Sequence, residues 1–416
     1  MDGTGKQTAG SKAAGSKTAS SKAAVKAVLE FGDPPYMPLG VYAVDCDLAS
    51  KILGRKTLVR DKVAQQIMLW EGRRDEVAQA LAEDGPELYK KLDCVDVVPA
   101  QKVAPPLPPK GSYLPPAGDP RRVKKIDEDT WKDSLGNVWK CAWETNDICQ
   151  VAWAPVDYSR YTAHIADVHS AVPPVDETIF EAYDAVLAAL ADDRFLLGHS
   201  SGFSPMALPG GMETGLMEYY LNPEPLRALI AHHTRVEAVQ DRFWLRPGMD
   251  AWFLESDMAT TRGPLMDPAM FRSFCLSAFI SRVESVKRYL PWVFFHSCGD
   301  NHALMDQYLQ TGIDCYQSLQ TGVMDLGPLI SEYGDRMSFW GGVPVELLVA
   351  GSPAEVKGAV RKAYEDAARA REDLRKRGKR GGAFILGPSH SAAYGTTYEN
   401  FMAMLDEHVR LRDKAV

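Results

Sequence analysis

The sequence lacks any apolar run of the roughly 18 residues that a transmembrane helix needs, so no membrane-spanning segment is predicted. It also lacks a basic excess, because 47 Lys and Arg residues against 55 Asp and Glu residues leave a net charge of −8. That balance excludes a general attraction for nucleic acid or anionic membranes. The seven cysteines are scattered and odd in number, which argues against a disulfide framework and favours a reducing, cytoplasmic compartment. What is present, 45% hydrophobic and 25% charged residues, is typical of a globular protein and excludes wholesale disorder.

The first 29 residues have little apolar surface. Their five lysines, at positions 6, 12, 17, 22 and 26, are accompanied by one acid, Asp2, among Ser, Thr, Ala and Gly residues. Such a segment buries too little apolar area to offset its ordering entropy, so residues 1–29 are predicted to form a disordered tail. A basic contact arm is the alternative. The segment has neither the apolar core of a secretory signal nor the arginines of a mitochondrial transit peptide.

Two further regions follow the tail. Residues 30–160 are expected to form an N-terminal elaboration, and residues 161–416 the main part of the fold. The elaboration includes a first barrel strand at 39–45 (LGVYAVD) and a proline-rich crossing at 99–122, where proline fixes φ and removes hydrogen-bond donors. Two short strands around a Gly-centred turn are also predicted there, at 133–140 and 151–156.

From about residue 176 onward, helical patterns alternate with short β-rich runs. This alternation implies parallel strands with helices over both faces of a sheet. The predicted class is α/β and the predicted fold is a (β/α)8 TIM barrel. A doubly wound open sheet is the alternative, but no G-x-G-x-x-G or P-loop follows any predicted strand. The helices are predicted at 176–191, 212–240, 268–289, 301–311, 353–377 and 399–412, and the strands at 194–200, 251–257, 292–298, 313–320, 337–343 and 383–390.

Polar residues stand at the C-terminal ends of the predicted strands, where a barrel collects its active site. His296 and Cys298 in FFHSCGD are two positions apart, so they face the same side of a strand. An imidazole and a thiolate suit Zn2+, and His390 at the end of the last strand completes a His2Cys set with an open fourth position, as in a catalytic zinc site. The alternative is a hydrogen-bonded buried histidine beside a small apolar cysteine. Cys315 is the reserve ligand.

Five more residues complete the predicted site. Asp257 and His199 are the catalytic candidates, Asp257 because a loop follows it at once. Glu255 lies on the same strand face as Asp257, and together with Gln320 and Trp340 it is predicted to bind the substrate. Tryptophan on or next to the strands favours a planar substrate.

Several stretches of the chain follow one another in the order and spacing of a known motif set. They are ETGLMEYYLNPE (213–224), FLESDMATTRGPLMDPAMFRSF (253–274), FFHSCGDNHALMDQYLQTGIDCYQSLQ (294–320), RMSFWGGVP (336–344) and LGPSHSAAYGTTYEN (386–400). With DSLGNVW (133–139) ahead of them, they resemble the uroporphyrinogen decarboxylase superfamily, particularly its cobalamin-linked methyltransferase branch. The resemblance covers somewhat more than half of the chain.

The resemblance implies a (β/α)8 barrel and bears on the activity. Porphyrin decarboxylases of the superfamily carry an arginine-containing signature near the N-terminus, whereas the corresponding segment here, 35–56, holds only Arg55. The methyltransferase branch binds zinc through an H-x-C pair, matched by His296 and Cys298, and a later Cys, replaced here by His390. This His form is similar to the sub-branch that demethylates methoxylated compounds and passes the methyl group to a corrinoid protein.

The predicted function is therefore zinc-assisted methyl transfer from a methoxylated, aromatic small molecule to the Co(I) cobalamin of a separate corrinoid protein. The sequence itself has no cobalamin-binding D-x-H-x-x-G module. A metal-free lyase of the decarboxylase type and a non-catalytic binding subunit are the alternatives. A thiol or pterin as methyl acceptor and a homo-oligomeric state stay open. Under both enzymatic hypotheses, residues 1–29 are predicted to be dispensable for activity.

Overall fold

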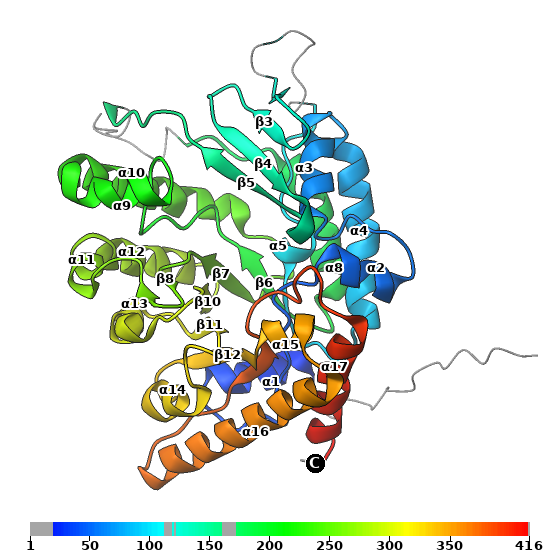
Figure 1. Ribbon diagram of the computed structural model, residues 1–416. Helices are drawn as coiled ribbons and strands as arrows, with labels where there is room; N and C mark the ends of the chain where they lie inside the picture. Colours follow the sequence, from blue (N-terminus) through cyan, green and yellow to red (C-terminus); the bar gives the residue numbers. More distant parts are fainter. Residues whose placement is uncertain (1–19, 112–118, 120–121, 160–171, 415–416) are drawn as a thin grey trace, which may run out of the picture.

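A curled parallel β-sheet forms the centre of the computed structural model, which describes residues 20–111, 119, 122–159 and 172–414 (Figure 1). The strand order is β1-β6-β7-β10-β11-β12-β13, and each neighbouring pair is parallel. The α/β class and the parallel sheet predicted from the sequence are thus confirmed. The strands are β1 (Val97–Pro99), β6 (Phe195–His199), β7 (Ala251–Glu255), β10 (Trp292–His296), β11 (Cys315–Leu319), β12 (Ser338–Val343) and β13 (Ile385–Pro388).

The two edges of this sheet are bridged by residues 39–44. Leu39 forms a parallel bridge with Leu386 of β13, and Gly40 forms one with Val97 of β1. The sheet therefore curls until one segment reaches both of its edges. An irregular segment stands where the first strand of a (β/α)8 barrel was predicted.

Helices cover the outside of the sheet, as the alternation of the sequence predicts. In α16 the Ser352 hydroxyl accepts from the backbone of Glu355 while that carboxylate accepts from the backbone of Ser352, which satisfies donors that the first turn leaves unpaired. No helix in the described part of the chain combines the length and the apolar character needed to cross a membrane. The helices after the elaboration are α8 (Glu181–Leu190), α9 (Met212–Leu221), α10 (Pro223–Trp244), α11 (Pro268–Phe274), α12 (Leu276–Lys287), α13 (Met305–Thr311), α14 (Leu326–Tyr333), α15 (Val345–Ala350), α16 (Pro353–Lys376) and α17 (Tyr398–Arg412).

The first part of the chain is more helical than its patterns indicate. The predicted helices and strands after residue 176 are present, but two of the helices divide: 212–240 at Asn222, because Pro223 has no amide to continue a helix, and 268–289 at Cys275. Two helices of this region, α14 and α15, were missed. Before residue 176, strand β1 was missed because this strand is only three residues long and ends at a proline. Four helices were also missed there: α2 (Cys46–Leu53), α3 (Lys62–Trp70), α4 (Arg74–Lys91) and α5 (Ala100–Val103).

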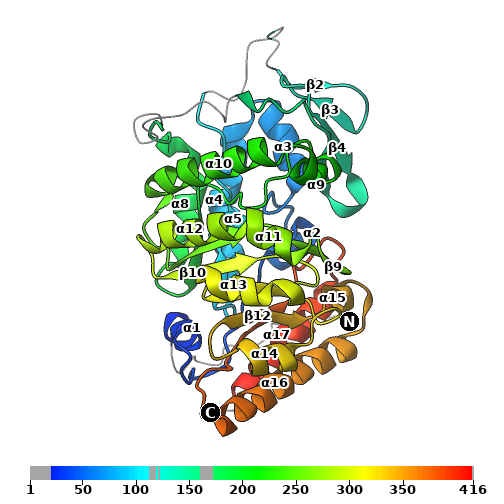
Figure 2. The same ribbon diagram turned by 90° about the vertical axis from the view of Figure 1, so that its left-hand side faces the viewer.

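A small antiparallel sheet, β2-β3-β4-β5, packs against α3 (Figure 2). Trp131 of this sheet lies with its ring centroid 5.5 Å from that of Trp70. The predicted Gly-centred turn is present, but its loop at Asp133–Gly136 joins β3 to β4, so the predicted strand 133–140 begins too early. The second predicted strand, 151–156, begins and ends too late, because β5 ends at Ala152. The strands are β2 (Lys124–Lys125), β3 (Thr130–Lys132), β4 (Val138–Ala142) and β5 (Asp147–Ala152).

The predicted disordered tail is wrong for its last ten residues, which begin with Ser20. Residues 1–19 lie outside the described part of the chain, but α1 (Ser21–Leu29) is a helix whose Ser20 side chain caps it. Its apolar face packs Val25, Val28 and Leu29 into the interior of the curled sheet. Composition averaged over 29 residues hid this short amphipathic stretch.

Polar contacts attach α1 to the beginnings of three strands. The Ser21 hydroxyl donates to Asp96, just before β1, and the Ser338 hydroxyl at the start of β12 donates to the backbone of Val28. Lys22 forms an ion pair with Asp250, just before β7, at 2.7 Å. Because parallel strands all begin at one end of the sheet, α1 closes the end opposite to the strand C-termini.

Candidate metal centre

Three side chains meet at the C-terminal end of the sheet. His296 is the last residue of β10, Cys298 follows it by two positions, and His390 follows β13. Their ligand atoms all lie within 4.8 Å of one another, and His296 Nε2 is 3.4 Å from Cys298 Sγ. The H-x-C spacing and the parallel neighbourhood of the last strand thus bring together the three predicted ligands.

The chain turns sharply directly after Cys298. Gly299 has a φ of +85°, and a Cβ there would lie 2.6 Å from the backbone oxygen of Thr260. Only glycine allows both the left-handed conformation and this close approach. The turn brings the loop after β7 against the loop that carries the thiol.

Neighbouring groups orient the three candidate ligands. His296 Nδ1 makes a hydrogen bond with Gln317 Oε1, which makes Nδ1 the donor and leaves Nε2 as the free acceptor on the side of the thiol. His390 Nδ1 lies 3.0 Å from Ser391 Oγ. Asp257 Oδ1 accepts from the backbone N–H of Cys298 at 2.8 Å and lies 3.6 Å from His296 Nε2.

Burial sets the protonation of these groups. It lowers the pKa of His296, and together with the neighbouring His296 it lowers the pKa of His390 to about 4, so both imidazoles are neutral at pH 7. Burial, followed by the charge of Asp257, raises the pKa of Cys298 to about 12. Neutral imidazoles are ready ligands, whereas the thiol loses its proton only when a cation binds. The donor set therefore fits Zn2+.

A charged layer lies beside the imidazoles. Glu255 Oε1 accepts from the Tyr42 hydroxyl at 2.7 Å and pairs with Lys102 Nζ at 2.8 Å, while Gln101 Nε2 lies 3.3 Å from Oε2. Burial alone would raise the pKa of Glu255, but Lys102 and then His296 outweigh it and lower the pKa to about 2. Glu255 was predicted to bind substrate, and the structure instead ties its carboxylate to three side chains of the protein.

Of the other predicted site residues, Asp257, after β7, and Gln320, after β11, contact the loop that carries Cys298. The Asp257 side chain is 58% exposed, so its second oxygen is open to a bound molecule. Gln320 Oε1 lies 3.4 Å from the backbone nitrogen of Gly299 and supports the turn after Cys298. Both residues therefore stay candidates, Asp257 for proton transfer and Gln320 for substrate contact.

The structure corrects two predictions on large or reserve side chains. Trp340 was predicted to bind substrate, but it is fully buried, its ring packs on Phe253 and its Nε1 donates to the backbone of Gly40. A Cβ at Gly40 would lie 2.5 Å from this ring, so the interior of the curled sheet is built around it. Cys315, the reserve ligand, is also fully buried in β11 and is not among the clustered ligands.

His199 ends β6, as predicted, and its environment is enclosed. Its ring centroid lies 5.3 Å from that of Trp244, and burial lowers its pKa, so the imidazole is neutral at pH 7. Its Nδ1 is buried and has no hydrogen-bond partner within the described residues. The histidine is thus poised for a further hydrogen bond, although its role as a catalytic residue stays a prediction.

Sequence patterns missed Tyr42, Lys102 and Gln317, which contact the ligands or their charged layer. Tyr42 lies in the irregular segment that bridges the sheet, Lys102 in the short helix α5, and Gln317 inside β11. Only Gln317 had a signal in the sequence, because it lies in the predicted strand 313–320; the register that pairs it with His296 comes from the structure.

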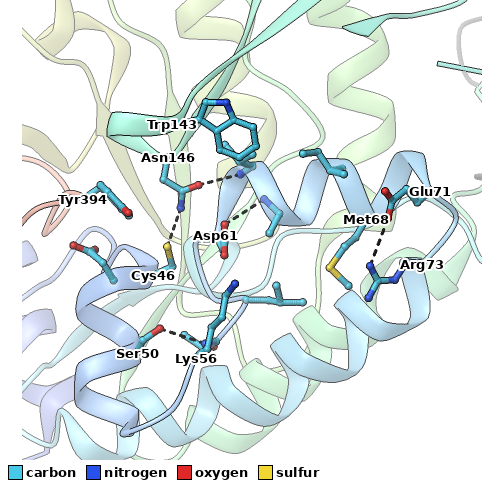
Figure 3. Close-up of a pocket in the computed structure, with 16 residues that line it drawn as sticks. Cys46, Ser50, Lys56, Asp61, Met68, Glu71, Arg73, Trp143, Asn146 and Tyr394 are labelled. Carbon is cyan, nitrogen blue, oxygen red and sulfur yellow. Dashed lines mark hydrogen bonds and ion pairs between the residues drawn. The ribbon is translucent and has the colours of Figure 1, made fainter. Parts of the chain in front are cut away.

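A cavity of about 640 Å3 lies between α2, α3 and the small sheet (Figure 3). Tyr394, four residues after His390, lines one side, and Trp143 and Asn146 line another. The backbone N–H of Tyr394 donates to Asp45, which pairs with Arg60. None of the three clustered ligands lines the cavity, so it is a separate feature from the metal centre.

The charged layer predicts a pH-dependent stability. Glu255→Gln is expected to cost about 2 kcal/mol at pH 7, because the ionised carboxylate is lost and Lys102 stays partly buried. A carboxylate with a lowered folded pKa stabilises the fold above its ordinary pKa, and this contribution disappears as the pH falls through the folded value. In urea unfolding at pH 7, 5.5 and 4, the deficit should therefore shrink by about 1 kcal/mol at pH 4. Glu284→Gln, on an exposed face of α12, is the control with no deficit. A deficit that is equal at pH 7 and pH 4 would contradict the paired, ionised Glu255.

Comparisons with known proteins agree with the fold. The family model described as Uroporphyrinogen decarboxylase (URO-D) matches residues 156–410, more than half of the chain. No curated protein matches the sequence significantly. Among solved structures, a methyltransferase from Methanosarcina mazei has a TM-score of 0.55 at 14% identity, over 94% of this chain and 99% of that one. A B12-independent methionine synthase from Shewanella sp. W3-18-1 has a TM-score of 0.34 at 11% identity, over 56% of this chain and 67% of that one, and is too distant to carry an argument.

Proposed function

Because the chain belongs to the uroporphyrinogen decarboxylase family, we propose that it is a zinc-assisted methyltransferase. It takes a methyl group from a methoxylated, aromatic small molecule, and the acceptor is the Co(I) corrinoid of a partner protein. The observation that carries the proposal is the His296, Cys298 and His390 cluster at the C-terminal end of a curled parallel sheet. The similar fold of a protein described as a methyltransferase also supports it.

The proposed chemistry follows from the ether bond. An aryl methyl ether is inert because phenolate is a poor leaving group, and zinc, when bound, would supply a Lewis acid at the ether oxygen. His296, Cys298 and His390 would hold the ion and leave a fourth position open for that oxygen. Asp257, exposed and 3.6 Å from His296 Nε2, would hold or deliver a proton at the departing oxygen.

The free cysteines and the position of the site are consistent with this proposal. All seven cysteines are free thiols, which is consistent with a reducing compartment such as the cytoplasm. The clustered ligands are at the end of the sheet that α1 leaves open, and a corrinoid from a separate protein must enter from that end. The alternative function is a metal-free lyase of the decarboxylase type that uses Asp257.

The metal content of purified protein tests the proposal. We expect close to one zinc per wild-type chain and a severe loss in His296→Ala, Cys298→Ser and His390→Ala, because each removes one of only three protein ligands. His302→Ala, an exposed histidine in the same loop, and Cys149→Ser, an exposed cysteine, are the matched controls and should keep the metal.

Methyl transfer then separates the two functions. With a methoxyarene and free reduced cobalamin, the wild type should form methylcobalamin, and the three ligand variants should lose about 100-fold or more of that rate. A folded wild type that holds no zinc, even after zinc is added, would reject this mechanism and favour the lyase. Zinc retained by His390→Ala would move the third ligand to another residue.

A further inference from the structure

The two imidazoles of the metal centre share one packing surface, the ring of Tyr42. Its centroid lies 4.6 Å from that of His296, with the planes 17° apart, and 5.2 Å from that of His390. Tyr42 is buried and belongs to the segment that bridges the two edges of the sheet. A single side chain therefore restricts the rotation of both candidate ligands, although one ends β10 and the other follows β13.

The ring of Tyr42 is itself held in place. Its hydroxyl donates to Glu255 at 2.7 Å, and Lys102, which pairs with the same carboxylate, lies with its Nζ 4.7 Å from the ring centroid. Phe253 packs against the ring edge-on, with the centroids 5.8 Å apart. A hydrogen bond, a cation–π contact and an aromatic contact thus fix the surface on which the imidazoles rest.

We propose that Tyr42 is a positioning residue of the metal centre: it holds His296 and His390 so that their nitrogens converge with Cys298 Sγ on one cation. The inference rests on the proposed function, because it requires a metal at that point. The aromatic ring packs on the imidazoles, and the hydroxyl anchors the ring. A phenylalanine keeps the ring and should therefore retain most of the positioning effect of Tyr42, whereas an aliphatic side chain should lose it.

Binding of Co2+, which reports its coordination geometry through visible absorption, tests this role. Affinity is measured by competition with a chromophoric chelator on the metal-free full-length protein. Tyr42→Leu should bind Co2+ about 10–100-fold more weakly and with an altered absorption spectrum, as for other groups that orient metal ligands. Tyr42→Phe should keep the wild-type spectrum and an affinity within about 3-fold of the wild type.

A second aromatic of the same core separates positioning from general packing. Phe294 is fully buried in the cluster that contains Tyr42, and it packs on Phe195 and Trp340. Phe294→Leu should lower the unfolding temperature yet keep the Co2+ affinity and spectrum. Wild-type Co2+ binding by Tyr42→Leu, or an equal loss of affinity in Phe294→Leu, would overturn the role of Tyr42. A wild type that binds neither Co2+ nor Zn2+ would overturn the proposed function instead.

Discussion

Ala24→Asp should destabilise the protein by about 4 kcal/mol or more, although composition alone places Ala24 in a disordered tail. Ala24 is fully buried in α1. An aspartate there must either bury a carboxylate or displace α1 from the curled sheet, which exposes the core contacts of Val25, Val28 and Leu29. Each of those side chains stabilises the fold by roughly 1.5–3 kcal/mol when fully buried, so both outcomes are strongly destabilising. Urea unfolding followed by tryptophan fluorescence measures the loss.

The neighbouring residue supplies the matched control. Ala23 is exposed and lies in the first turn of α1, where a carboxylate interacts favourably with the helix dipole. Ala23→Asp should therefore stay within about 0.5 kcal/mol of the wild type. Equal stability of the two variants would contradict the docking of α1. Deletion of residues 2–29 should likewise cost stability and activity, which reverses the prediction that the whole segment is dispensable, whereas deletion of residues 2–19 leaves α1 intact.

Arg282→Met is the second change with a large expected effect, a loss of about 3–5 kcal/mol. Arg282 on α12 is fully buried and pairs with Asp241 and Glu237 on α10. It also donates to the backbone oxygen of Gly202 at 2.7 Å, and Asp241 accepts from Ser201. Removing the guanidinium leaves two carboxylates buried without their counter-ion and releases the loop that follows His199.

Two further variants and one local measurement make this prediction specific. Arg288→Met, at the exposed end of α12, should change stability by about 0.5 kcal/mol or less. The double variant Arg282→Met with Asp241→Asn should recover part of the loss, because it removes one of the uncompensated charges. Hydrogen exchange of the Ser201 amide should be faster in Arg282→Met. Unchanged unfolding and unchanged exchange would show that the buried pair contributes nothing to holding this loop.

Local sequence patterns located most elements of the second part of the chain, although they missed the short helices α14 and α15. Helical and strand periods alternate strongly after residue 176, and elements of that length follow from residue spacing alone. The spacing of two residues also predicted that His296 and Cys298 lie together, although Cys298 follows the end of β10, and the return of the last strand placed His390 near them. These assignments depend on contacts within one element or on the common direction of parallel strands.

Where contacts are distant in sequence, the patterns failed. Trp340 was predicted to bind substrate, but its side chain fills the interior of the sheet against Gly40, 300 positions away. Glu255 was predicted to bind substrate, but its carboxylate forms an ion pair with Lys102 of α5. In each case the burial and the partner of the side chain decide its role, and neither is encoded in its own neighbourhood.

The sequence by itself determined the α/β class, the parallel strands after residue 176 and the three candidate metal ligands, because these follow from periodicity and strand direction. Only the tertiary structure decided that α1 is part of the core, that the segment with Tyr42 bridges the edges of the sheet, and that one aromatic ring supports both imidazoles. A short amphipathic helix is too weak a pattern to stand out from its polar neighbours, and its stability comes from the surface that it covers.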